Sequence, residues 1–305
     1  MFDMPIDNNL PLTPGIDPSA GALQTVYSLQ RHTEWVSQPT SAEIQQRLAG
    51  ARFSLIAGVL NPRGTAGQAY IAQRDKQIVV AFRGTGGATT AETVQSALDD
   101  AQAIQWRPRD ILSRDQAPDA QVHFGFCRLY ERFRADLHTA IETHEHDAIY
   151  VTGFSLGSAL ASLCALDIKL RYGLAPTVVL LGTPRVGNPA FVEFYDAEVP
   201  DTLRVVLRED PASRVPLSIR GALRYQHLGG LLTLASDGGL PVPQDEISGL
   251  EAANTDLLAH DRDIYRDALV DLFAAHEADS TVVSPSLFAE SARTERESVE
   301  PLDLL

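Results

Sequence analysis

The segment from Tyr150 to Ala161 contains a Gly-x-Ser-x-Gly motif with Ser155 at its centre. A β-rich apolar stretch precedes the motif and an Ala- and Leu-rich stretch follows it, which predicts a strand, a sharp turn and a helix. The two glycines lack a Cβ, so the turn can hold the serine in a strained conformation with its hydroxyl above the sheet edge. The helix N-terminus offers unpaired N–H groups to a developing oxyanion. Without this context the motif would be an ordinary glycine-flanked turn; with it, the pattern predicts a serine nucleophile.

A serine nucleophile needs a histidine as general base and an acid that orients the histidine. In the strand–turn–helix arrangement the acid follows the serine in the chain and the histidine comes last. Asp210 fits the acid, because it comes after the apolar run 203–207 and leads into a loop that two prolines stiffen. An aspartate before a proline is also ordinary turn chemistry, which is the alternative for this residue.

Three histidines lie downstream of Asp210: His227, His260 and His276. His276 is the weakest candidate, since it lies near the end of the last helical stretch. His227 lies beside an expected strand, and His260 opens a helical run. The pattern alone leaves the choice between His227 and His260 open, and either could be a structural histidine that only makes a hydrogen bond.

The elements that must position these groups alternate along the chain. Apolar periodicity, capping signals and turn residues predict helices at 18–31, 125–141, 156–172 and 255–275, with a short helix after the capping box at Thr40. The same reading predicts strands at 51–60, 68–73, 77–82, 148–152, 177–181 and 203–207. The first three strands follow each other through short turns and indicate a meander. The later strands alternate with helices, which implies parallel pairing.

Composition limits the possible partners. The chain has 305 residues, of which 44% are hydrophobic, and its formal net charge is −15. Such a charge argues against binding to nucleic acid or to anionic membrane surfaces, because long-range repulsion slows encounter with both. The two cysteines, Cys127 and Cys164, lie in apolar helical sequence, so we expect buried free thiols, with a single bridge as the alternative.

Five linked motifs resemble those of the class 3, or fungal-lipase-like, α/β-hydrolases. They occur in the expected order, and the resemblance spans about residues 51–265. The motifs lie at 81–85 (Ala-Phe-Arg-Gly-Thr), 122–126 (Val-His-Phe-Gly-Phe), 152–161, 182–188 (Gly-Thr-Pro-Arg-Val-Gly-Asn) and 206–216. The resemblance implies a mostly parallel central sheet flanked by helices, with a helical lid.

The resemblance also implies roles for single residues. The family's acid follows the strand after Pro-Arg-Val-Gly, which matches Asp210. Its base lies in a His-x4-Tyr pattern that His260 reproduces, whereas the Tyr-x-His-x-Gly segment around His227 resembles a structural element. The backbone N–H groups of Thr85 and Leu156 would form the oxyanion hole, with the Thr85 hydroxyl as a further donor.

Two departures from the family pattern concern the elbow and the lid. The elbow usually reads Gly-His-Ser-Leu-Gly-Gly, but this chain has Phe154 and Ser158 in place of the histidine and the last glycine. The lid segment, about 86–105, lacks the family's tryptophan and larger apolar residues. Its helix would present a small apolar face made of Val94, Ala97, Leu98, Ala101 and Ile104. We therefore expect weak interfacial activation; the alternative is an ordinary surface helix.

Taken together, the sequence predicts a single α/β-hydrolase domain at 1–276 and an acidic C-terminal extension at 277–305, loosely docked or disordered. The expected activity is carboxylic ester hydrolysis of the lipase or esterase type, with Ser155, Asp210 and His260 as triad. Phospholipase A1 and feruloyl-type esterase activities are alternatives within the enzymes. A catalytically silent, lipase-like binding module is the alternative from another class.

The expected partners are small-molecule or lipid esters, with at most transient contact with a lipid–water interface and no nucleic acid. No metal or organic cofactor is expected. The His144-Glu145-His146 run and the aspartates from Asp261 to Asp271 lack a converging ligand set and fit solvated polar sequence. No signal peptide is legible at the N-terminus, which leaves a cytoplasmic location or export by another route, and the sequence leaves acyl-chain preference and oligomeric state open.

Overall fold

The computed structural model describes residues 20–38, 40–59, 69–84, 104–113, 115–216, 224–235 and 259–278. Its helices are α1 (Ala20–Trp35), α2 (Ser41–Gly50), α4 (Phe124–Thr143), α5 (Leu156–Tyr172), α6 (Pro189–Glu198), α7 (Arg262–Ala278) and the 3-10 helix η1 (Pro211–Arg214). Its strands are β1 (Ser54–Val59), β2 (Ala69–Arg74), β3 (Gln77–Phe82), β4 (Gln105–Trp106), β5 (Val122–His123), β6 (Ala148–Phe154), β7 (Thr177–Leu181), β8 (Thr202–Leu207) and β9 (Gly230–Leu234).

Seven of these strands form one sheet in the order β1-β2-β3-β6-β7-β8-β9. The first three strands pair antiparallel, which confirms the predicted meander. From β3 to β9 every neighbouring pair is parallel, as the alternation of strands and helices predicts. The carboxyl ends of β6, β7 and β8 therefore meet at one edge of the sheet, where parallel sheets present ligand and catalytic groups.

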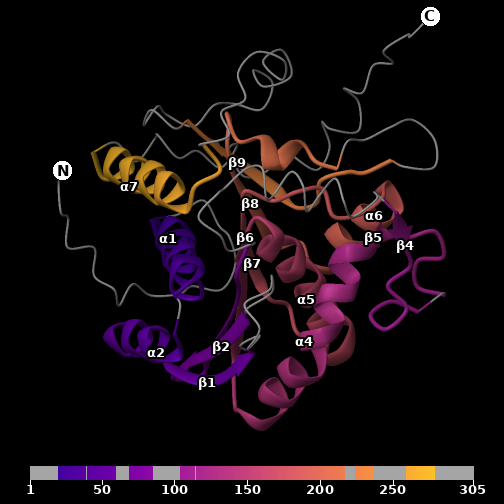
Figure 1. The fold of residues 1–305 in the computed structure, drawn as a ribbon, viewed down its shortest axis with the longest axis horizontal. Helices are drawn as coiled ribbons and strands as arrows, with labels where there is room; N and C mark the ends of the chain where they lie inside the picture. The colour runs from indigo at the N-terminus through magenta and orange to yellow at the C-terminus, as the bar shows by residue number, and fades with distance from the viewer. Residues whose placement is uncertain are drawn as a thin grey trace, which may run out of the picture.

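Helices cover both faces of this sheet (Figure 1): α1, α2 and α7 lie on one side, and α4, α5 and α6 on the other. The side chains of the central strands alternate between the two layers. Ile78, Val80 and Phe82 of β3 belong to the hydrophobic cluster under α4 and α5, whereas Val79 and Ala81 belong to the cluster under α1, α2 and α7. A strand buried on both faces reads as a continuous apolar run, which is why periodicity alone locates these strands well.

Helix α5, which follows the elbow, is anchored to α4 by a buried carboxylate. Asp167 accepts hydrogen bonds from Tyr130, Arg134 and His138, at 2.6–2.8 Å. Burial alone would raise the pKa of Asp167, but these three donors outweigh it and hold the pKa below its ordinary value. The helix that begins beside the elbow is thereby held in place along its length.

Several boundaries differ from the sequence predictions. Helix α7 begins at Arg262 instead of near residue 255, because the backbone N–H of Asp263 bonds to the Asp261 carboxylate and starts the helix there. Helix α6 is not predicted, although Asn188 caps it and Pro189 opens it. The capping box at Thr40 and Glu43 is confirmed, and Cys127 and Cys164 are buried free thiols. The predicted lid helix at about 86–105 lies almost entirely outside the described residues, as does the chain beyond residue 278.

Candidate active site

Ser155 occupies the tight turn between β6 and α5 that the motif predicts. Its φ of 56° and ψ of −125° lie in a region that non-glycine residues rarely adopt. The backbone N–H of Ser155 donates to the carbonyl oxygen of Leu181 at 2.9 Å, which ties the turn to the end of β7. The residue is 3% exposed. Packing against the neighbouring strand thus maintains a strained conformation, as expected for a functional position.

Both glycines of the motif are required by close backbone contacts. A Cβ at Gly153 would lie 2.2 Å from the carbonyl oxygen of Gly157, and a Cβ at Gly157 would lie 2.4 Å from that of Phe82. Neither distance is compatible with a side chain, because the obstructing atoms are backbone. The start of α5 therefore packs directly on β6 and on the end of β3.

Asp210 lies directly after β8, at the same edge of the sheet, and is fully buried. Its Oδ1 accepts a hydrogen bond from the N–H of Ala212 at 2.7 Å, which begins η1. Its Oδ2 accepts from the Tyr265 hydroxyl at 2.6 Å and from the His260 Nδ1 at 2.8 Å. The carboxylate is thus held in one orientation by three donors, two of which come from the segment around the start of α7.

His260 faces Asp210 through Nδ1 and leaves its other nitrogen open. Because Nδ1–H donates to the carboxylate, Nε2 is the unprotonated nitrogen in the neutral ring. Nε2 is buried and has no hydrogen-bond partner among the described residues. The ring of Phe154, the residue before the serine, stacks on the imidazole with centroids 4.8 Å apart. An oriented imidazole with an open acceptor is the form a general base takes.

The other two histidines have different surroundings. His227 donates from Nε2 to the carbonyl oxygen of Ser213 at 2.7 Å, and burial together with Arg204 and Arg185 holds its pKa well below its ordinary value. It supports the loop after Asp210 instead of contacting the carboxylate. His276 lies in the last turn of α7. Of the histidines downstream of Asp210, the structure brings His260 into contact with it.

Two further residues complete the surroundings of the acid and were not singled out from the sequence as site residues. Tyr265 donates to Asp210 and accepts from the N–H of Leu207 at 3.1 Å, so it bridges the acid to β8. Gly182, with φ 56°, lies where a Cβ would be 3.0 Å from the Asp210 Oδ2 and 3.1 Å from the His260 ring. The His-x4-Tyr spacing was the available signal for Tyr265; the close approach at Gly182 had none beyond the glycine itself.

The two departures at the elbow have structural roles. Phe154 stacks on His260 and also meets the Tyr265 ring edge-on, with centroids 5.5 Å apart. The Ser158 hydroxyl donates to the carbonyl oxygen of Ser155. The aromatic ring therefore restrains the histidine through packing, and the added hydroxyl gives the Ser155 carbonyl a second donor beside the Ser158 N–H.

Of the two residues expected to form the oxyanion hole, Leu156 is described by the structure and Thr85 is not. Leu156 is the first residue of α5, so its N–H lies among the helix N-terminal groups that have no intrahelical acceptor. Thr85 lies outside the described residues, one position beyond Gly84. A Cβ at Gly84 would meet the Phe154 carbonyl oxygen at 2.8 Å and the Ser155 Cβ at 3.3 Å, so the chain passes close to the serine just before Thr85.

Among the described residues, no group of three or more His, Cys, Asp or Glu side chains could hold a metal ion. Likewise, none of the described helices combines the length and apolar character needed to cross a membrane.

Comparison with known proteins finds similarity in the part of the chain that contains Ser155 and Asp210. Residues 79–219 match the family model for class 3 lipases. The chain is 32% identical over 176 residues to the secreted mono- and diacylglycerol lipase LIP1 of Malassezia globosa, covering 53% of this chain and 56% of that protein. It is 29% identical over 153 residues to the chloroplastic phospholipase A(1) DAD1 of Arabidopsis thaliana, covering 46% of this chain and 34% of that protein.

The fold also has close counterparts among solved structures. Lipase II of Rhizopus niveus superimposes with a TM-score of 0.61 and 21% identity, covering 79% of this chain and 94% of that one. The predicted fold, a mostly parallel sheet flanked by helices, is therefore confirmed. The chain spans about half the length of the Malassezia lipases that it matches. Residues 79–219, which include the strained serine and the buried aspartate, are therefore similar to the class 3 lipases.

Proposed function

We propose that this protein hydrolyses carboxylic esters through an acyl-enzyme, with Ser155 as nucleophile, His260 as general base and Asp210 as the acid that orients it. The observation that carries the proposal is the buried His260–Asp210 pair, which turns Nε2 away from the carboxylate and leaves it without a partner among the described residues. This pair lies at the sheet edge where the strained turn presents Ser155.

The reaction follows from these groups. His260 Nε2 takes the hydroxyl proton of Ser155 as the serine oxygen bonds to the ester carbonyl carbon, and the carbonyl oxygen becomes an oxyanion. Asp210 stabilises the resulting imidazolium through Nδ1. The proton then passes from Nε2 to the leaving alcohol as the carbon–oxygen bond breaks. In the second half of the reaction, His260 Nε2 takes a proton from water as the water oxygen bonds to the acyl carbon. The bond between this carbon and the Ser155 oxygen then breaks, the Ser155 oxygen takes the proton from Nε2, and the carboxylic acid product leaves.

The substrate class is proposed from the relatives. The matched relatives are named as mono- and diacylglycerol lipases and as phospholipases A1. The charge of −15 favours neutral glycerides over anionic phospholipids, because repulsion lowers the local concentration of anionic surfaces. A rate profile with p-nitrophenyl esters from C2 to C18, beside a phospholipid substrate, tests the proposal and separates these classes. If the protein hydrolyses none of these esters, the remaining alternative is a catalytically silent, lipase-like binding module.

We further propose that residues 1–276 form one domain, with a lid at about 86–105 and an acidic extension at 277–305. Helices α1 and α7, at the two ends of the described chain, pack on the same face of the sheet (Figure 1). This mutual packing supports a single unit.

Replacement of Thr85 by valine is expected to lower kcat by about 10²-fold with little change in KM, if the hydroxyl assists the backbone N–H at the oxyanion. The loss falls on kcat because the oxyanion exists only in the transition state. Steady-state kinetics on p-nitrophenyl butyrate measure it. Unchanged kinetics would restrict the role of Thr85 to its backbone.

An exposed apolar patch supports contact with a lipid–water interface. The exposed large hydrophobic side chains of the described residues are Ile104, Trp106 and Phe124, 38–45% exposed. They lie together: the Phe124 N–H donates to the Ile104 carbonyl oxygen at 2.9 Å, and the rings of Trp106 and Phe124 are 5.6 Å apart. The Arg109 guanidinium lies 6.0 Å from the Trp106 ring. Aromatic and arginine side chains in this combination suit the boundary between lipid and water. We propose that this aromatic patch contacts neutral lipid.

Replacing both Trp106 and Phe124 by alanine is expected to weaken binding to neutral triacylglycerol emulsions about tenfold or more, because each large side chain contributes roughly 1.5–3 kcal/mol when buried. Activity on dissolved p-nitrophenyl butyrate should stay unchanged. Trp106→Phe, which keeps the aromatic surface, is the matched control. Equal loss on dissolved and emulsified substrate would contradict a role at the interface.

A further inference from the structure

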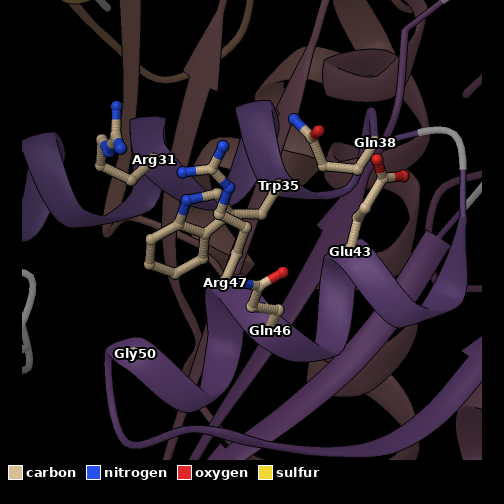
Figure 2. A pocket seen from close by; sticks show the side chains of 7 residues that line it. All are labelled: Arg31, Trp35, Gln38, Glu43, Gln46, Arg47 and Gly50. Carbon is tan, nitrogen blue, oxygen red and sulfur yellow. The ribbon is translucent and has the colours of Figure 1, made fainter.

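A hollow of about 380 Å³ lies between α1 and α2 (Figure 2), and its lining does not include Ser155, Asp210 or His260. Its lining comes from both helices: Arg31, Trp35 and Gln38 from α1 and its end, and Glu43, Gln46, Arg47 and Gly50 from α2. Figure 2 shows the side chain of Arg47 reaching from α2 toward the Trp35 indole, with Arg31 on the neighbouring turn of α1. Two guanidinium groups and an indole N–H therefore serve one hollow.

Several hydrogen-bond donors in this hollow lack acceptors. Trp35 is 4% exposed, and its Nε1 is buried with no partner among the described residues. The Arg31 Nε is likewise buried and has no hydrogen-bond partner among the described residues, although the Arg31 Nη1 donates to Glu34. Buried donors without an acceptor cost free energy, so each calls for a group that the described residues do not supply. What is missing at both positions is an acceptor, which an anion would provide.

The charges around the hollow also favour an anion. Arg47 makes no ion pair with any described residue. The carboxylate on the lining, Glu43, is engaged by the capping box, where it accepts from the N–H and the hydroxyl of Thr40 at 3.1 and 2.7 Å. Glu43 keeps its charge in the capping box but makes no ion pair with Arg47.

A second hollow, of about 430 Å³, shares Arg31, Trp35, Gln38 and Arg47 with the first and continues toward the start of α7. Arg266, on its lining, is held by Asp263 and Asp267. Arg262 makes no ion pair in the described part of the chain; Arg83 repels its guanidinium, whereas Asp261, Glu34 and Asp263 attract it. The second hollow also carries the carboxylates of Glu34, Asp261 and Asp263, so of the arginines shared by the two hollows it is Arg47 that has no ion-pair partner among the described residues.

We propose that the hollow between α1 and α2 binds a tetrahedral oxyanion of the phosphate class, through Arg31, Arg47 and the Trp35 indole N–H. Arginine suits this role because its planar fork donates two parallel hydrogen bonds to oxyanions. Arg47 is exposed and held by no described carboxylate, so it can turn aside to admit the anion to the indole edge and then close over it. This binding site is separate from the proposed ester hydrolysis and does not depend on it.

Tryptophan fluorescence gives a direct test, because the chain has two tryptophans and Trp106→Phe leaves Trp35 as the single reporter. Inorganic phosphate is titrated at constant ionic strength, with sodium chloride as the balancing salt. We expect a saturable change of Trp35 emission. Arg47→Gln should weaken phosphate binding about tenfold or more, and Arg47→Lys less, because lysine keeps the charge but loses the fork. Arg128→Gln, at an exposed arginine on α4, is the matched control and should titrate like the parent.

Calorimetry with Trp35→Phe tests the indole N–H itself, since phenylalanine keeps the apolar ring and removes the donor; weaker phosphate binding is expected. The proposal is overturned if chloride reproduces the emission change, or if Arg47→Gln and Trp35→Phe bind phosphate as the parent does. Vesicles of phosphatidylglycerol, compared with phosphatidylcholine alone, distinguish the source of the anion. Displacement of phosphate by the anionic vesicles identifies a lipid headgroup, and the lack of displacement identifies a dissolved anion; both keep the site.

Discussion

Alanine at Ser155 or at His260 is expected to lower kcat for ester hydrolysis by about 10⁶-fold, because the nucleophile and its base act as one unit. Both side chains are almost fully buried, but neither belongs to the hydrophobic clusters, so the fold should survive. Steady-state kinetics on p-nitrophenyl butyrate measure the loss, and circular dichroism with thermal unfolding checks the fold. The double variant should be no worse than either single one, since the removed groups serve the same step.

His227→Ala is the discriminating control for this prediction. His227 bonds to the carbonyl oxygen of Ser213 and does not contact Asp210, so its removal should affect stability more than kcat. An inactive His227→Ala beside an active His260→Ala would show that the base has been assigned to the wrong histidine.

Replacement of Asp210 by asparagine is expected to lower kcat by about 10⁴-fold. The Asp210 Oδ2 accepts from both the His260 Nδ1 and the Tyr265 hydroxyl, and it carries the charge that stabilises the imidazolium. Asparagine removes that charge and can present an N–H to Nδ1, which favours the wrong tautomer of the ring. The same ester assay measures the change.

Two further variants serve as comparisons for Asp210→Asn. Tyr265→Phe removes one hydrogen bond to the carboxylate but leaves its charge, so a loss of only about tenfold is expected, the size of one hydrogen bond to a charged group. Glu209→Gln changes the neighbouring carboxylate, which pairs with Arg208, and should leave kcat near the parent value. An Asp210→Asn protein that keeps full activity would remove Asp210 from the mechanism.

Local sequence determined the elbow and the sheet that holds it. The apolar run before Ser155 and the helical run after it read unambiguously, because a strand buried on both faces and a helix buried on nearly every side have long, continuous hydrophobic signals. The glycines at 153 and 157 are likewise local: their backbones pack within the turn they form and against the adjacent strand. The parallel order of the later strands followed from their alternation with helices.

The position of Asp210 could be predicted for a similar reason. Asp210 directly follows a strand, and the ends of parallel strands share one edge, so its position relative to Ser155 depends on topology that the alternation already implies. The histidine is different. His260 lies 50 residues beyond Asp210, and no sequence periodicity predicts where that segment packs against the sheet. The spacing of residues favoured His260 and His227 equally as the base, and only the resemblance to a family distinguished them.

Tertiary structure alone decided which side chains meet across the layers. The stack of Phe154 on His260 joins β6 to the segment just before α7, and the contact of Trp106 with Phe124 joins β4 to the start of α4. The arginines beside Trp35 come together because α1 and α2 cross on one face of the sheet. A sequence pattern reports which face of an element is buried, but contacts between elements depend on how their faces pack in three dimensions, which no local spacing encodes.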